Sequence, residues 1–270
     1  MRLKSALPLA AVFVVTLCAS DLLAQKEFDE AREKIAAFWG ETSKPINDPA
    51  QREKVTGMAS ELPGTIKPLI DSGILSYLNE TRTVSIDELT LKISAALSYP
   101  YETSNTLADA NNEVSVIPLP DRNGYAIAYD IATCASCSTS WVEIVARRDD
   151  RWVFTDHLDN PATDDAIHLG WVGPETAPLL AVYGIHWGDA HNRLDVRIYS
   201  VNDGIMPVWS SLDLSQGEIA IQGDRITLKF WTQPTPWADT TKPYREEQQV
   251  FEVNNRQVKL LETKFPSPKK

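Results

Sequence analysis

Residues 125–131 of this chain read Tyr-Ala-Ile-Ala-Tyr-Asp-Ile. Large apolar side chains alternate there with small or polar ones, which is the two-residue period of a half-buried β-strand. The same period recurs at residues 142–146, 194–198 and 226–230. The sequence therefore predicts a β-rich region that begins near residue 113 and continues to the end of the chain.

Short polar pairs or triplets separate these strands, and most contain Asp, Asn or Gly. They are Asp149-Asp150, Asn202-Asp203-Gly204, Gly223-Asp224 and Asn254-Asn255. Tight turns of this kind join antiparallel neighbours, because a parallel crossover needs a much longer connection. One long polar loop is expected at Leu158–Pro178, since loops of that length in compact domains are often functional.

A weak internal repeat pairs a strand with the strand after its turn. Three such units are too few to close a β-propeller, so we expect hairpins within one open, rolled or sandwiched antiparallel sheet. The three pairs are Trp141–Arg148 with Arg151–His157, Arg193–Val201 with Met206–Leu212, and Gln248–Val253 with Arg256–Thr263.

Before residue 100 the apolar period is helical. Phe28, Ala31, Ile35 and Phe38 share one face of a helix expected at 26–39. Further helices are expected from Asp48, with Pro49 in its first turn, and over 65–78, where Pro68 and Gly73 weaken the pattern. The last helix has a capping box at Ser85 and Glu88, and Pro100 ends it.

These patterns predict an α+β protein with a small N-terminal helical region and a larger antiparallel β domain of meander or sandwich-like form. The expected boundaries are a signal peptide at 1–24, a helical region at 25–100, a linker at 101–112 and the β domain at 113–270. Segment 101–112 is polar and has no apolar period.

The first 24 residues have the order of a secretory signal peptide. Arg2 and Lys4 precede an apolar run, and the small residue Ala24 offers a cleavage point. The run is shorter than the ~20 residues that span a bilayer, so no stable transmembrane anchor is expected after cleavage. Retention as an anchor and lipidation at Cys18 stay open as alternatives. The mature protein is expected in the periplasm or outside the cell.

The chain of 270 residues carries a formal net charge of −11. Such a surface repels phosphate backbones, so nucleic acid is not an expected partner. An envelope protein or another ligand is expected instead, of a kind that the sequence does not specify.

Cys134 and Cys137 are the two cysteines left after cleavage. In an oxidising compartment they favour a short-range disulfide that stiffens a loop between two strands. A redox role or metal binding stays open as an alternative.

The segment His186-Trp-Gly-Asp-Ala-His191 is the best candidate for a metal site. A turn at Gly188 could bring His186, Asp189 and His191 together, and imidazole with carboxylate suits zinc. Calcium is a second candidate cofactor, on oxygen ligands of an acidic loop. Those ligands would be Asp156, Asp159, Asn160, Asp164 and Asp165.

Trp231, Trp237 and Tyr244 flank a proline-rich segment and could form an aromatic platform for sugar rings or for a partner's side chains. They could equally cover the edge of the core. Catalytic residues are not identified, since no serine-hydrolase elbow or phosphate-binding glycine loop is present.

The expected function is therefore a non-enzymatic binding or interaction module that uses loops at one end of its sheet. Two alternatives stay open: a metal-binding protein or metal-dependent enzyme built on His186–His191, and a thiol–disulfide protein built on Cys134 and Cys137.

Overall fold

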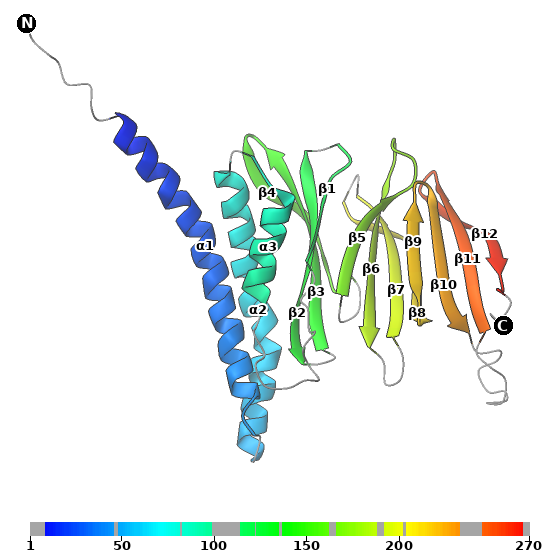
Figure 1. Cartoon of the computed structure of the whole chain (residues 1–270), viewed down its shortest axis with the longest axis horizontal. Helices are drawn as coiled ribbons and strands as arrows, with labels where there is room; N and C mark the ends of the chain where they lie inside the picture. Colours follow the sequence, from blue (N-terminus) through cyan, green and yellow to red (C-terminus); the bar gives the residue numbers. More distant parts are fainter. Residues whose placement is uncertain are drawn as a thin grey trace, which may run out of the picture. The chain divides into compact units, whose positions relative to one another are not determined.

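The structure is a computed structural model of the whole chain (Figure 1). It describes residues 9–45, 48–81, 83–98, 114–121, 123–134, 137–161, 166–187, 192–201, 204–232 and 245–266. The protein is α+β, with helices first and antiparallel strands after them, as the sequence predicts. The expected linker at 101–112 lies outside the described residues.

The chain divides into two compact units. The helical unit comprises residues 1–104 together with 148–153, and the β unit comprises residues 105–147 and 154–270. The helices are α1 (Leu9–Thr42), α2 (Pro49–Glu80) and α3 (Ile86–Leu97).

The apolar face predicted for the first helix is confirmed. Phe28, Ala31, Ile35 and Phe38 are each 3% exposed or less. The helix is longer than expected, because it starts at Leu9 and continues through the candidate cleavage site without a break. Glu30 and Lys34, one turn apart on this helix, form an ion pair at 3.5 Å.

The expectation of separate helices from Asp48 and over 65–78 is wrong, because both belong to α2. Pro63 and Pro68 lie inside this helix. A buried row at four-residue spacing runs past both prolines, and the side chains of the prolines lie off this row. Packing of that row outweighs the ~3 kcal/mol by which proline disfavours a helix interior. The buried row is Leu62, Ile66, Ile70, Ile74 and Leu78.

The two capped helix starts that the sequence predicts, at Asp48 and Ser85, are confirmed. The side chain of Asp48 accepts a hydrogen bond from Gln51 N at 2.8 Å, with Pro49 as the first residue of α2. Ser85 Oγ accepts from Glu88 N at 3.2 Å at the start of α3. Each cap satisfies a backbone donor that has no partner within the helix.

The β unit and the hairpin tip at 148–153 contain three four-stranded antiparallel sheets, each a meander of consecutive strands. The first sheet has β1 (Ser115–Pro118), β2 (Gly124–Cys134), β3 (Cys137–Arg148) and β4 (Arg151–Asp159). The second has β5 (Ala166–Val172), β6 (Leu179–Trp187), β7 (Asn192–Ser200) and β8 (Met206–Ser215). The third has β9 (Glu218–Gln222), β10 (Arg225–Thr232), β11 (Arg245–Asn254) and β12 (Gln257–Lys264).

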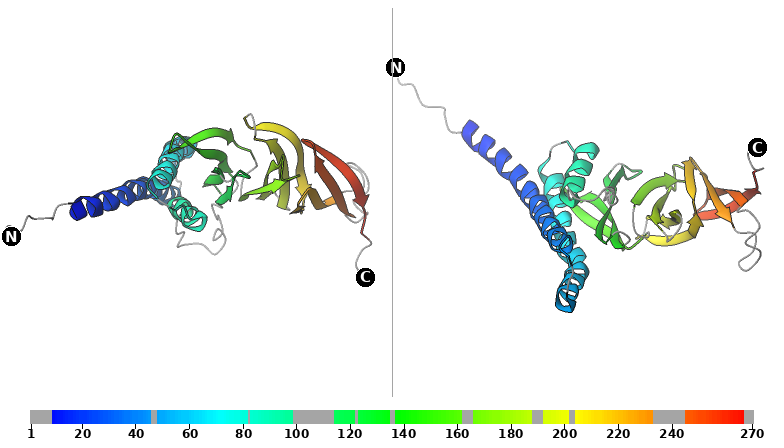
Figure 2. Two further views of the ribbon diagram at one scale, coloured as in Figure 1. Left: turned by 90° about the horizontal axis from the view of Figure 1, so that it is seen from above. Right: turned by 60° about the horizontal axis from the view of Figure 1, so that its bottom comes forward.

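The expectation of one sheet is therefore wrong. The sheets follow one another in sequence order (Figures 1 and 2). One core joins the first sheet to the second through residues such as Val142 and Leu180. Another joins the second to the third through residues such as Ala181 and Leu228. Strand β6 thus buries successive side chains on opposite faces, as a strand between two sheets must.

The loop expected at Leu158–Pro178 is also interrupted, because it contains β5. Ile167, Leu169 and Val172 are buried there. Ile167 and Leu169 lie on one face and pack in the core between the first two sheets, and Val172 packs in the core between the second and third.

The first strands of the three sheets all run in the same direction. Leu169 N donates to Ser115 Oγ at 3.2 Å, and Trp171 Nε1 donates to the carbonyl of Pro118 at 2.8 Å. Strands β1 and β5 therefore run side by side in the same direction. The ends of β5 and β9 meet in the same way, because Gly173 N donates to the carbonyl oxygen of Gly223 at 3.0 Å.

Candidate functional site

The common direction of the sheets gathers their second connections at one end of the β unit. Strands β2, β6 and β10 all run toward this end, at the lower edge of Figure 1. We call it the loop end. The connections that begin there at residues 135, 188 and 233 carry or adjoin all three candidate motifs of the sequence.

The cysteine motif closes the β2–β3 hairpin. Cys134 and Cys137 are opposite each other in the register, with two residues between them. Cys137 is exposed and takes part in a disulfide bond. The side chain of Cys134 lies outside the described part of the chain. Thr133 Oγ1 donates to the carbonyl of Cys137 at 3.3 Å, a second link across the same turn.

The histidine motif lies between β6 and β7. His186 pairs with Arg193 in the register near the end of this hairpin. Asp189 and His191, and the side chain of His186, lie outside the described residues, so the geometry of a metal site there is not defined. Within the described residues, no group of three or more potential metal ligands occurs.

The described acidic residues of the β4–β5 connection have structural partners. Asp156 accepts hydrogen bonds from Ile205 N at 2.6 Å and from His157 N at 2.9 Å. Asp159 lies 3.7 Å from His157. Asp164 and Asp165 lie outside the described residues.

Asn160 joins the first two sheets. Its N–H donates to the carbonyl of Ser140 at 2.8 Å, and its side-chain oxygen accepts from Ser140 N at 3.3 Å. Its own carbonyl accepts from Arg197 Nη1 at 3.2 Å. These bonds make Asn160 a joint between the first two sheets.

Trp231 is the last residue on the face of β10 that points away from the second sheet. Its exposed fraction is 39%. Glu246 is its cross-strand neighbour on β11. Trp237 and Tyr244, the other two aromatic candidates, lie outside the described residues.

An arginine–aromatic pair at the loop end was not identified from the sequence. The guanidinium of Arg245 lies 3.4 Å from the ring centroid of Phe265, which is 46% exposed. Arginine stacked on an aromatic ring is typical of protein-binding surfaces. The two residues are 20 apart in the chain, so only the pairing of β11 with β12 brings them together.

The phenols of the sheet cores are structural. Burial raises the pKa of Tyr183 and of Tyr199 above the ordinary value of 10.0. Both pack in the cores between sheets, where a neutral phenol is favoured.

The helical unit has a shallow groove of about 190 Å³ between α1 and α3. Phe28 and Ala96 form its buried floor, and Leu91 stands at its rim with 68% exposure. Among the described helices, none has the length and apolar character required to cross a membrane.

No protein-family model, curated protein or solved structure matches this chain. Its candidate functions therefore depend on its own residues.

Proposed function

We propose that this protein is a secreted or periplasmic binding module that recognises an envelope protein or another ligand through the loop end of its β unit. The observation that supports the proposal is the common direction of the three sheets, which brings Cys137, the backbone of His186 and Trp231 to one end of the β unit. Binding sites on β folds are commonly built from loops at one end of a rigid scaffold.

Arg245 and Phe265 offer contact area on one face of the third sheet at this end, and Trp231 offers it on the other face. Their side chains combine a rigid apolar surface with a donor group, which gives binding energy at a low cost in side-chain entropy. The proposed partner is recognised by these three residues and by the connections between strands.

The experiment is site-specific photo-crosslinking of the full chain in cells that produce it. A photoreactive residue replaces Thr232 at the loop end, or Asn255 in the turn between β11 and β12 at the opposite end. The proposal expects a discrete adduct from position 232 and none from position 255. Adducts from 255 alone, or equal adducts from both, would contradict it.

The proposed disulfide joins Cys134 to Cys137. Their opposition in the register and the disulfide state of Cys137 support this pairing. A disulfide that closes a ring of only four residues restricts the unfolded chain slightly, so it stabilises the folded state by only ~2 kcal/mol. Reduction is therefore expected to leave the β2–β3 hairpin folded, and a mild thiol that opens the bond without loss of fold would favour the thiol–disulfide alternative.

The alternative of a metal site needs a separate test. His186 lies at the end of β6, opposite the start of β7, and so at the loop end. Stoichiometric zinc that is lost in both His186→Ala and His191→Ala would favour it. Zinc content unchanged by either substitution would exclude that site.

A further inference from the structure

Gln25 becomes the first residue of the mature chain when the proposed signal peptide is removed after Ala24. The inference below therefore rests on the export that belongs to the proposed function. Gln25 lies in α1, and its side chain is exposed. A terminal glutamine can undergo a reaction that an internal one cannot, because its free α-amine and its own side-chain amide are held within reach of each other.

The packed part of α1 begins just after Gln25. Glu27 accepts hydrogen bonds from two serines of α2, from Ser72 Oγ at 2.5 Å and from Ser76 Oγ at 3.1 Å. Phe28 follows it and is 3% exposed. These contacts hold the beginning of the shortened helix against α2 and leave its first residue outside the packed part.

The side chain of Gln25 is held only weakly. Its Nε2 donates to Asp29 Oδ1 at 3.1 Å, an exposed contact one turn along the helix. The same oxygen accepts from Arg32 Nη2 at 2.8 Å, so Asp29 keeps a charged partner when Gln25 turns away. An exposed hydrogen bond contributes little, because water replaces it. The amide of a terminal Gln25 can therefore fold back toward its own nitrogen.

We propose that the mature N-terminus of this protein is a pyroglutamate formed from Gln25. The unprotonated α-amino nitrogen attacks Cδ of the side-chain amide, so that a new N–Cδ bond closes a five-membered lactam and the Cδ–Nε2 bond breaks. Nε2 leaves as ammonia with a proton from the attacking nitrogen. The step needs no oxidant, reductant or second substrate, and the chain loses one ammonia and its terminal positive charge.

The start of the shortened helix favours this product. A free ammonium on Gln25 would lie at the positive end of the helix dipole, where a positive charge is unfavourable. The lactam is neutral, and a ring of the proline type is tolerated in the first turn of a helix, where the backbone nitrogen has no partner within the helix. Glu27 and Asp29 still provide negative charge near this end.

The test combines tandem mass spectrometry of the N-terminal peptide with Edman degradation, which requires a free α-amine. Both are applied to the protein produced from the full chain and purified from its export compartment. The wild-type peptide is expected to begin at position 25 and to be lighter by one ammonia than its sequence. It is also expected to give no Edman signal until pyroglutamyl aminopeptidase has removed the ring.

Gln25→Asn is the matched control. Asparagine keeps the amide but is shorter by one methylene, so the same attack would have to close a strained four-membered ring. This variant is expected to be cut at the same place and to be readable by Edman degradation from its first residue.

The outcomes separate this inference from the export on which it rests. A wild-type chain that starts at Gln25 and keeps its free amine after prolonged incubation would overturn the pyroglutamate and leave export intact. A Gln25→Asn variant that is blocked like wild type would also overturn it, because the block would then have another cause. A chain that is not cut after Ala24 would contradict both proposals.

Discussion

Gly73 shows how one small residue sets the distance between two helices. A Cβ atom built at this position lies 2.7 Å from Cε1 of Phe28, a ring that is 3% exposed. The α1 ring therefore occupies the space that a side chain on α2 would need. The sequence identifies Gly73 only as a weak point in a helix, because its role depends on a residue 45 positions away.

Gly73→Ala is expected to destabilise the helical unit by about 1 kcal/mol. Overpacking against a buried ring costs ~1–3 kcal/mol, and alanine recovers up to ~1 kcal/mol of helix propensity. Gly64→Ala in the same helix is the control, because nothing lies within 4 Å of its Cβ position. That control is expected to stabilise by up to ~1 kcal/mol. Urea unfolding of both variants measures the difference, and equal effects would refute the packing role.

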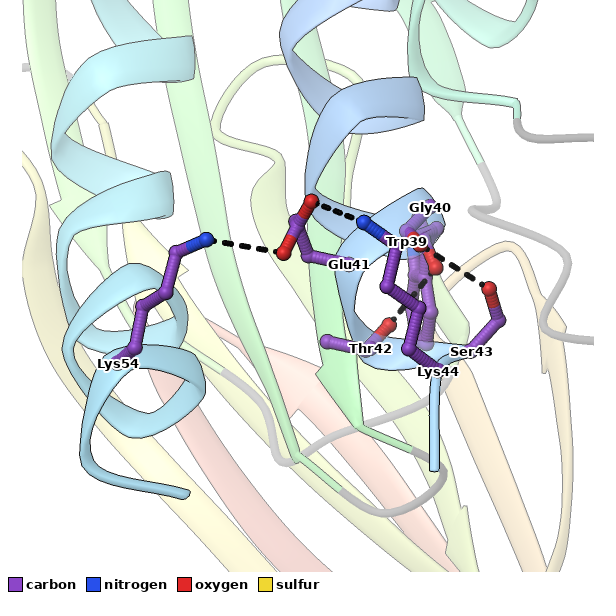
Figure 3. A network of polar contacts seen from close by, with 7 residues as sticks. All are labelled: Trp39, Gly40, Glu41, Thr42, Ser43, Lys44 and Lys54. Carbon is purple, nitrogen blue, oxygen red and sulfur yellow. Dashed lines mark hydrogen bonds and ion pairs between the residues drawn. The ribbon is translucent and has the colours of Figure 1, made fainter. Parts of the chain in front are cut away.

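Glu41 connects the end of α1 with α2 (Figure 3). Its carboxylate accepts from Lys44 Nζ at 2.5 Å and from Lys54 Nζ at 2.9 Å. The hydrogen bonds from Lys44 and Lys54, and then their charges, lower the pKa of Glu41 from an ordinary value of 4.5 to about 2. A group with a lowered folded-state pKa stabilises above its unfolded pKa, and that contribution disappears as the pH falls through the folded value.

Glu41→Gln is therefore expected to lower stability at neutral pH, with a difference from wild type that shrinks as the pH falls from about 4.5 to about 2. The effect is small, because the pair is exposed to solvent. Carboxyl NMR titration of wild type and of Lys54→Met gives the direct measurement. Loss of this lysine is expected to raise the pKa of Glu41. An unchanged titration would mean that Lys54 does not contribute.

At the scale of elements, a buried carboxylate shapes the edge of the second sheet. Asp195 on β7 is 4% exposed, and its Oδ1 accepts from Asp213 N at 2.7 Å. The register of β7 and β8 shifts at this point, and Asp213 has a φ of 62°. The carboxylate thus binds a backbone donor that the interrupted ladder would leave unpaired. The side chain of Asp213 returns to β7 through an ion pair with Arg193.

Asp195→Ala is expected to cost about 2–3 kcal/mol, because it leaves a buried N–H unsatisfied and removes a charge-assisted hydrogen bond. Asp195→Asn keeps an acceptor oxygen and is expected to lose less. Asp213→Asn is the control for the ion pair, since it keeps the backbone donor, tolerates the φ of 62° and removes only the exposed charge. Thermal unfolding should find Asp195→Ala the least stable of the three variants and Asp213→Asn the most stable, and an Asp195→Ala variant as stable as Asp213→Asn would refute this role.

Elements with a local signal were predicted well from the sequence. The capping residues Ser85 and Asp48 and the alternating strand at 125–131 have the expected structure. Elements whose local signals conflict were not predicted. Strand β5 is a short alternating segment inside a stretch with the composition of a polar loop, and α2 was divided in the prediction because proline disfavours a helix interior. Packing supplied what the local pattern lacked.

At the scale of the whole molecule, the weak repeat found in the sequence has a structural cause. Its three strand pairs are the third and fourth strands of the three sheets, β3–β4, β7–β8 and β11–β12. The repeat did not include the first two strands of each sheet, so the number of sheets was not predicted, although β2 and β10 were predicted as strands. The loop end was not predictable either, because it depends on the common direction of β1, β5 and β9, which hydrogen bonds such as that of Trp171 to Pro118 establish.

Processing of the N-terminus can be tested on the intact protein. Helix α1 passes through Leu23, which is 54% exposed, and Ala24, which is 2% exposed. A peptidase needs an extended segment, so cleavage after Ala24 must precede folding of the helical unit. The shortened helix would start at Gln25 and keep its buried face from Phe28 to Phe38. Of the two side chains described in the removed segment, that of Ala24 is buried and that of Leu23 is exposed.

An intact mass spectrum of the protein from its export compartment is expected to show a chain that starts at Gln25 and is two hydrogens lighter than the reduced form. Ala24→Leu is expected to block cleavage, because the position before the cut needs a small residue. Leu23→Phe should not, since that residue is exposed and precedes the small one. A full-length mass in wild type would instead indicate a retained N-terminal anchor, and an unshifted mass in Ala24→Leu would place the cut elsewhere.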